Sequence, residues 1–163
     1  MKHFFFFFFL SSSVVYSQTY ETTFTVKVVS VIDGNTLEVV DDNDNHLTFL
    51  LSEVDCPEIG QSLSEEAKSF TSDLVLKKKV IVQRKGKDWL GNKLAVVKLK
   101  KGTILHEELL KAGLAWASKK ASNQSTSLQS NAKERSLGIW SAAEPTPPWI
   151  FRRQQTMNQS KGR

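Results

Sequence analysis

The stretch 24–54, FTVKVVSVIDGNTLEVVDDNDNHLTFLLSEV, consists of three apolar segments separated by two short polar ones. β-Branched residues and partial alternation of apolar and polar side chains predict strands over 24–32, 36–40 and 46–54. Asp33-Gly34-Asn35 is a turn signal, and 41–45 is a polar hairpin loop. The three strands are therefore expected to form an antiparallel meander.

The rest of the body predicts two more strands and three helices. Ser62-x-x-Glu65 fits a capping box that begins a helix to about residue 76. The further elements are strands over 79–85 and 93–100, a short helix over 105–110 capped by Thr103 and ended by Gly113, a polar linker at 123–127, and a helix over 128–136 ended by Gly138. This order predicts a mainly β chain with α additions (α+β), a five-stranded OB-fold barrel with about three helices.

The N-terminus has the pattern of an export signal. A basic start at 1–3 precedes the apolar run 4–10, and small residues at Val15-Tyr16-Ser17 suit cleavage before Gln18. The run is shorter than the roughly 20 residues of a spanning helix, and an uncleaved anchor is the alternative. We expect a signal peptide at 1–17, an exported (secreted or periplasmic) protein without stable membrane insertion after cleavage, a barrel domain at 18–153, and a polar, basic, disordered tail at 154–163.

The net charge gives little information about partners. The chain of 163 residues has a formal charge of +5, and five cations near its ends account for it: Lys2, Arg152, Arg153, Lys161 and Arg163. The body between them is balanced, so the high isoelectric point is weak evidence for a nucleic-acid partner. Apolar content of 40% and charged content of 24% exclude a wholly disordered chain and a multi-span membrane protein.

Several single residues have ordinary structural interpretations. Cys56 is the only cysteine, so we expect a small half-buried residue, with a reactive thiol as the alternative. Asp33 is expected to serve the turn rather than a metal. His46 and His106 lack metal-ligand spacing and receive no role.

Eight motifs follow one another along the chain: VIDGNT (31–36), VDCPE (54–58), EEAKSF (65–70), D-x-x-G (88–91), LAVV (94–97), EELLKAGLAW (107–116), LGIW (137–140) and PPW-x-x-RR (147–153). In order and spacing they resemble the thermonuclease, or staphylococcal-nuclease-like, family. The resemblance implies an OB-fold barrel and, in active members, calcium-dependent cleavage of DNA and RNA phosphodiesters.

Hydrolysis of a phosphodiester benefits from three kinds of group. A hard divalent cation binds oxygen ligands, guanidinium groups bind phosphoryl oxygens, and a carboxylate activates water. The resemblance places a calcium ligand on Asp55, a backbone-carbonyl ligand on Cys56 and the water-activating carboxylate on Glu58. Calcium is therefore the expected cofactor if the site still functions.

Three other positions depart from the family pattern. The second aspartate of the family turn, a calcium ligand, is Asn35, which removes one negative charge. The two catalytic arginine positions are Leu50 and Asn92, and neither neighbouring cation replaces them, because Lys93 faces the other side of its strand and Arg84 lies on the preceding strand. We expect lost or weak phosphodiesterase activity.

The partner remains open between three hypotheses. A monomeric nuclease homologue with lost or weak activity would bind DNA, RNA or a protein; the alternatives are an active calcium-dependent endonuclease and an OB-type protein-interaction module. Basic runs such as Arg84-Lys85-x-Lys87 and Lys119-Lys120, with Trp89 and Trp116, could bind bases and phosphates. We favour solvated lysines and two core tryptophans.

Overall fold

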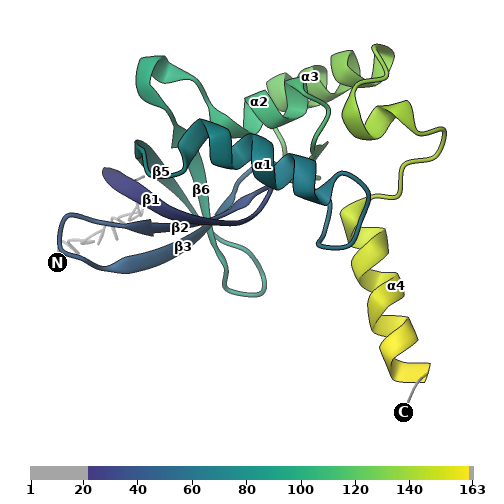
Figure 1. Cartoon of the computed structure of the whole chain (residues 1–163), viewed down its shortest axis with the longest axis horizontal. Coiled ribbons are helices and arrows are strands. Elements are labelled where there is room, and N and C mark those ends of the chain that lie inside the picture. Colours follow the sequence, from purple (N-terminus) through teal and green to yellow (C-terminus); the bar gives the residue numbers. More distant parts are fainter. Residues whose placement is uncertain (1–21, 162–163) are drawn as a thin grey trace, which may run out of the picture.

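The computed structural model describes residues 22–161. Five strands close into a barrel in the order β1-β2-β3-β6-β5, and only the β3–β6 pair is parallel. The strands are β1 (Thr23–Asp33), β2 (Thr36–Val40), β3 (His46–Leu51), β5 (Lys79–Lys87) and β6 (Lys93–Lys98). Figure 1 shows helices packed along one side of this barrel and a last helix that extends away from it. The expected α+β architecture with a five-stranded OB-like barrel is confirmed.

The barrel interior is filled by alternate side chains of its strands. On β1, Val26 and Val28 point inward. A register shift between Val28 and Ser30 changes the phase, so that Val31 is the next buried residue. Phe49 of β3 is the largest fully buried side chain.

The third strand is shorter than the sequence predicts. Instead of continuing to Val54, it ends at Leu51, and Glu53 adopts a left-handed backbone conformation with φ 71°. The chain then forms β4 (Val54–Asp55), which pairs outside the barrel with β7 (Trp116–Ala117). This break directs the VDCPE stretch away from the barrel wall.

Four α-helices and two short 3-10 helices complete the described part of the chain. They are α1 (Ser64–Val75), η1 (Lys100–Gly102), α2 (Leu105–Lys111), α3 (Asn123–Glu134), η2 (Gly138–Ser141) and α4 (Pro148–Lys161). Helix α1 lies across the barrel, with Ala67 and Val75 fully buried. Leu105, Leu109 and Leu110 of α2 extend the same core.

Two predicted helix caps and one predicted helix start are wrong. Helix α1 follows Leu63, which has φ 64° and no side-chain cap, so Ser62 does not form a capping box. Helix α2 follows Ile104, also without a side-chain cap, so Thr103 does not cap it. Helix α3 begins at Asn123, where a linker was expected, because the Ser122 hydroxyl accepts a hydrogen bond from the Ser125 amide.

The C-terminal tail also differs from the prediction. Residues 154–161, expected to be disordered, continue α4 as a helix. The helix begins at a proline, which is favourable in a first turn, and its N-terminal part is held to the body through Arg152. The predicted signal peptide at 1–17 lies outside the described residues. No helix in the described part of the chain is long and apolar enough to cross a membrane.

Candidate active site

One cleft brings together most of the positions that the sequence singles out. It has a volume of about 570 Å³ and lies where the β1–β2 turn, the end of β3, β4, the β5–β6 hairpin and the start of α4 meet. Five of the six predicted site residues line it: Asn35, Leu50, Asp55, Glu58 and Asn92. Cys56, the sixth, does not line the cleft and is only 1% exposed.

The β1–β2 turn is fixed by its own residues and by α1. The Asp33 carboxylate accepts hydrogen bonds from the Asn35 amide and the Thr36 hydroxyl, both at 2.9 Å, as expected of a turn residue. Gly34 packs directly against Cys56, since a Cβ at residue 34 would lie 2.7 Å from the Cys56 Cβ. The buried Thr71 hydroxyl donates to the Gly34 carbonyl at 2.7 Å. This packing sets the position of Asn35.

The side chain of Asn35 is used to position the VDCPE stretch. Its Oδ1 accepts a hydrogen bond from the Cys56 amide at 3.1 Å. The Cys56 thiol is buried, and desolvation, followed by the negative charges of Asp33, Asp55 and Glu58, raises its pKa well above the usual value. The thiol is therefore neutral, and the residue is more deeply buried than the half-buried position expected.

A guanidinium group from α4 binds both retained carboxylates. Arg152 donates to Asp55 through two nitrogens, at 3.1 Å and 2.8 Å, and one of these nitrogens also donates to Glu58. The hydrogen bond and charge of Asp55, together with Glu58, raise the pKa of Arg152 above its usual value. The Glu58 amide donates to the Gln61 side chain at 2.8 Å, which fixes the loop. The two carboxylates therefore face an internal cation.

The two positions at which the resemblance implies arginines provide no cation. Leu50 sits in the sheet between Thr36 and Leu94 and has no polar side-chain atom. The Asn92 side chain donates to the Asp88 carboxylate at 2.8 Å, inside the β5–β6 turn. Arg84 lies over the ring of Phe24, 4.7 Å from its centroid, and so does not replace either one.

The donor set does not fit a calcium ion. Calcium takes six to eight oxygen ligands and favours carboxylates. Here Asp55 and Glu58 are paired with Arg152, and the Asn35 oxygen accepts a backbone amide. Among residues 22–161, no group of three or more His, Cys, Asp or Glu side chains is arranged to hold a metal ion.

Sequence reasoning missed Arg152 as a site residue. It lies 97 residues from Asp55 along the chain, and its charge was counted as part of a terminal surplus. The PPW-x-x-RR motif was a usable signal, because it places two arginines inside one of the eight motifs that carry the family resemblance. The carboxylates needed a counter-ion, and no Lys or Arg is present between Glu38 and Ala67.

The two tryptophans considered for base stacking have opposite environments. Trp116 is 6% exposed and packs edge-on against Trp140 at 5.5 Å, as a core residue was expected to do. Trp89 is 90% exposed, so the prediction of a core role is wrong for it. It stands in the β5–β6 turn, between Lys87 and Lys93.

Comparison with known proteins agrees with this geometry. A family model described as staphylococcal nuclease homologue matches residues 48–142. A protein from Haemophilus influenzae named an uncharacterized endonuclease is 37% identical over 138 residues, covering 83% of this chain and 77% of that protein. A micrococcal nuclease from Shigella flexneri is 29% identical over 142 residues, covering 80% and 81%. The described barrel, the cleft and these similarities together show that the chain belongs to the staphylococcal nuclease family.

Proposed function

We propose that this protein is an exported nuclease homologue that binds nucleic acid and hydrolyses phosphodiesters weakly or not at all. The export proposal is supported only by the sequence pattern of residues 1–17. The proposal of weak activity is supported by the pairing of Arg152 with Asp55 and Glu58. Nucleic-acid binding is supported by family membership.

The chemistry of the cleft explains why hydrolysis would be slow. A pentacovalent phosphoryl group carries charge that guanidinium groups stabilise, and removing one such donor costs about 100- to 1000-fold in rate. Leu50 offers no donor, and the Asn92 amide is already bonded to Asp88. These losses need not multiply, but both act in the same direction.

The remaining arginine does not repair the site as it stands. Arg152 could bind a phosphate only by leaving the two carboxylates, which would expose their charges to a polyanion. While it stays paired, Glu58 has a cation rather than a water in contact with one of its oxygens. Glu58 is therefore a poor general base in this arrangement.

The proposal is tested by a digestion assay with purified protein, DNA and calcium. We expect no cleavage above a buffer control at ordinary enzyme concentrations. Robust cleavage that Glu58→Gln abolishes would contradict the proposal and would instead support the second candidate, an active calcium-dependent endonuclease. That second candidate is favoured by the retained Asp55 and Glu58 and by relatives named endonuclease.

A further inference from the structure

An exposed aromatic side chain lies on a hydrogen-bonded turn next to the cleft. Trp89 is 90% exposed and its neighbour Leu90 is 65% exposed. Burying an aromatic side chain stabilises a folded protein, and an exposed indole does not contribute this free energy. Exposed apolar side chains that lie together beside a cleft, as Trp89 and Leu90 do, are a pattern found at ligand-binding surfaces.

The turn that carries Trp89 is held by Asp88. Its carboxylate accepts hydrogen bonds from the Leu90 amide at 2.9 Å and from the Asn92 amide at 2.8 Å. The bond from the Asn92 side chain is the largest of the causes that lower the pKa of Asp88. Asp88 therefore stays charged, and its carboxylate oxygens are hydrogen-bonded within the turn. These bonds fix the backbone that carries Trp89.

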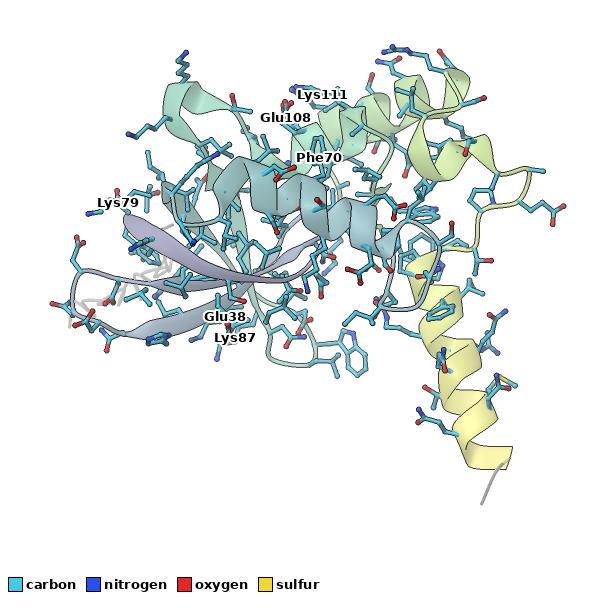
Figure 2. All side chains as sticks on the ribbon, viewed as in Figure 1. Glu38, Phe70, Lys79, Lys87, Glu108 and Lys111 are labelled. Atoms are coloured by element: carbon cyan, nitrogen blue, oxygen red, sulfur yellow. The ribbon has the colours of Figure 1, made fainter. Side chains whose placement is uncertain are left out.

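Four lysines line a cleft together with this aromatic side chain. A second cleft, of about 550 Å³, is lined by Trp89 together with Lys85, Lys87, Lys119 and Lys120. We call these five residues the Trp89 surface. Figure 2 shows Lys87 on the side of the barrel opposite α1, whereas Lys79, at the other end of β5, lies far from it and is paired with Asp42.

The acidic residues of this cleft leave a positive balance. Glu53 and Asp88 also line it, against the four lysines. The Glu53 carboxylate accepts hydrogen bonds from the Ser122 and Ser125 hydroxyls at 2.7 Å and 2.6 Å, so it is engaged by the start of α3. The cleft therefore presents four lysines against two carboxylates, a positive balance that favours a polyanion.

The second cleft continues into the first. Asp88, Trp89, Leu94, Ser118 and Lys119 line both. A chain bound along the lysines would therefore reach the cleft that contains Asp55 and Glu58. The balanced net charge of the body conceals this local concentration of cations.

We propose that the Trp89 surface binds single-stranded nucleic acid, with the indole stacked on one base and the lysines in contact with the flanking phosphates. The proposal rests on the proposed function and names the form of nucleic acid bound. A duplex hides the faces of its bases, whereas a single strand offers them to an exposed ring. Base stacking on an aromatic side chain contributes about 1–3 kcal/mol per base, and it tolerates any sequence.

The test is fluorescence polarisation with a labelled oligothymidine and a duplex of equal length. We expect the full protein to bind the single strand more tightly than the duplex. Trp89→Ala should weaken single-strand binding by about 5- to 150-fold, the affinity equivalent of one stacked base. Trp89→Phe should keep most of the affinity, while Trp89→Leu, which preserves apolar area without a ring, should behave like Trp89→Ala. Leu90→Ala is the control for the loop.

The lysines are tested by the salt dependence of binding. Replacing both Lys119 and Lys120 with Gln should reduce the slope of log affinity against log salt by about 0.7 for each lost contact. Lys100→Gln with Lys101→Gln removes the same charge from exposed positions elsewhere and should leave the slope unchanged.

The outcomes separate this inference from the function on which it rests. Failure of the wild-type protein to bind either oligonucleotide would refute the proposed nucleic-acid binding and, with it, this inference. Normal single-strand binding by Trp89→Ala, or a preference of the wild type for the duplex, would overturn the Trp89 surface alone. All of these substitutions are at exposed positions, so circular dichroism should show an unchanged fold.

Discussion

Arg152 brings a positive charge into a cleft whose carboxylates would otherwise repel each other. Its side chain is 50% exposed, so its ion pairs contribute little to the stability of the fold, about 0.2–1 kcal/mol by analogy with other exposed pairs. Its effect on cation binding is larger, because any cation that binds Asp55 must first displace a guanidinium bonded through two nitrogens.

Removing Arg152 should therefore restore some affinity for divalent cations. We expect isothermal titration to detect no calcium binding by the wild type and weak, measurable binding by Arg152→Gln, since Asp55 and Glu58 would regain their free charges. Arg153→Gln changes the adjacent exposed arginine and is the matched control. Equal calcium affinity in all three proteins would show that Arg152 does not control the site.

The Cys56 thiol should be inert in the folded protein. Burial raises its pKa and excludes reagents, so the native protein should not react with Ellman's reagent at pH 8. After denaturation in guanidinium, one thiol per chain should react. Rapid reaction of the native protein would support the reactive thiol that we set aside.

At this scale the sequence pointed to five of the residues that line the cleft. The family resemblance singled out Asn35, Leu50, Asp55, Glu58 and Asn92, and the structure brings all five to one cleft. It could not place Arg152, because nothing local to residue 152 says which surface α4 contacts. It also could not show the exposure of Trp89, since residue type alone does not determine burial.

Among the elements, the β1–β2 turn is the one on which the site depends most directly. Gly34→Ala would put a Cβ 2.7 Å from the Cys56 Cβ and 2.9 Å from the Ala67 Cβ. Overpacking of this kind costs about 1–3 kcal/mol, which urea denaturation would detect as a lower midpoint. Gly60→Ala is the control for the substitution, because its Cβ would meet nothing within 4 Å, although its positive φ adds some backbone strain. If Gly34→Ala were no more destabilising than Gly60→Ala, the packing of the turn would be looser than described.

His106 of α2 lies close to Glu53 of the β3–β4 turn, and this contact should make the stability of the fold depend on pH. His106 is 4% exposed and lies 3.8 Å from Glu53, and desolvation lowers its pKa below the usual 6.5 despite the nearby Glu53 and Glu107. The unfolded state then binds a proton more readily than the folded state. Stability should therefore fall as the pH drops below about 6.5, from the reference histidine value.

His106→Gln tests this dependence, because it removes the titrating group from the same position. Thermal unfolding between pH 7 and pH 5 avoids the lower range in which Glu53 takes up protons. We expect the loss of stability over this interval to be smaller in His106→Gln than in the wild type. An unchanged pH profile would assign the dependence to other groups.

The boundaries of an element were predictable where one of its faces is buried. They were less predictable where local contacts determine where the element begins or ends. The alternation of Val26 and Val28 revealed β1, and the same period revealed β2. The start of α3 was missed because its first turn is polar and its helix signal is a single serine cap. The helical tail was missed because α4 has no strong apolar periodicity, and its attachment through Arg152 is a tertiary contact.

For the whole molecule, the distribution of charge matters more than its sum. Five cations near the chain ends equal the formal charge of +5, yet one of them, Arg152, is neutralised within the site. Four further lysines lie in the balanced body, on the Trp89 surface. We propose that the molecule combines a weakened hydrolytic cleft with an adjoining surface suited to a polyanion.

The most direct test of this combination is to rebuild the site on the same scaffold. Asn35→Asp, Leu50→Arg, Asn92→Arg and Arg152→Gln would together restore the missing charges and remove the internal cation. In one calcium-dependent DNA digestion assay, we predict no detectable cleavage by the wild type and clear cleavage by the fourfold variant. If the wild type cleaved DNA at the same rate as the variant, and Glu58→Gln abolished that cleavage, the proposal of a weakened site would be contradicted.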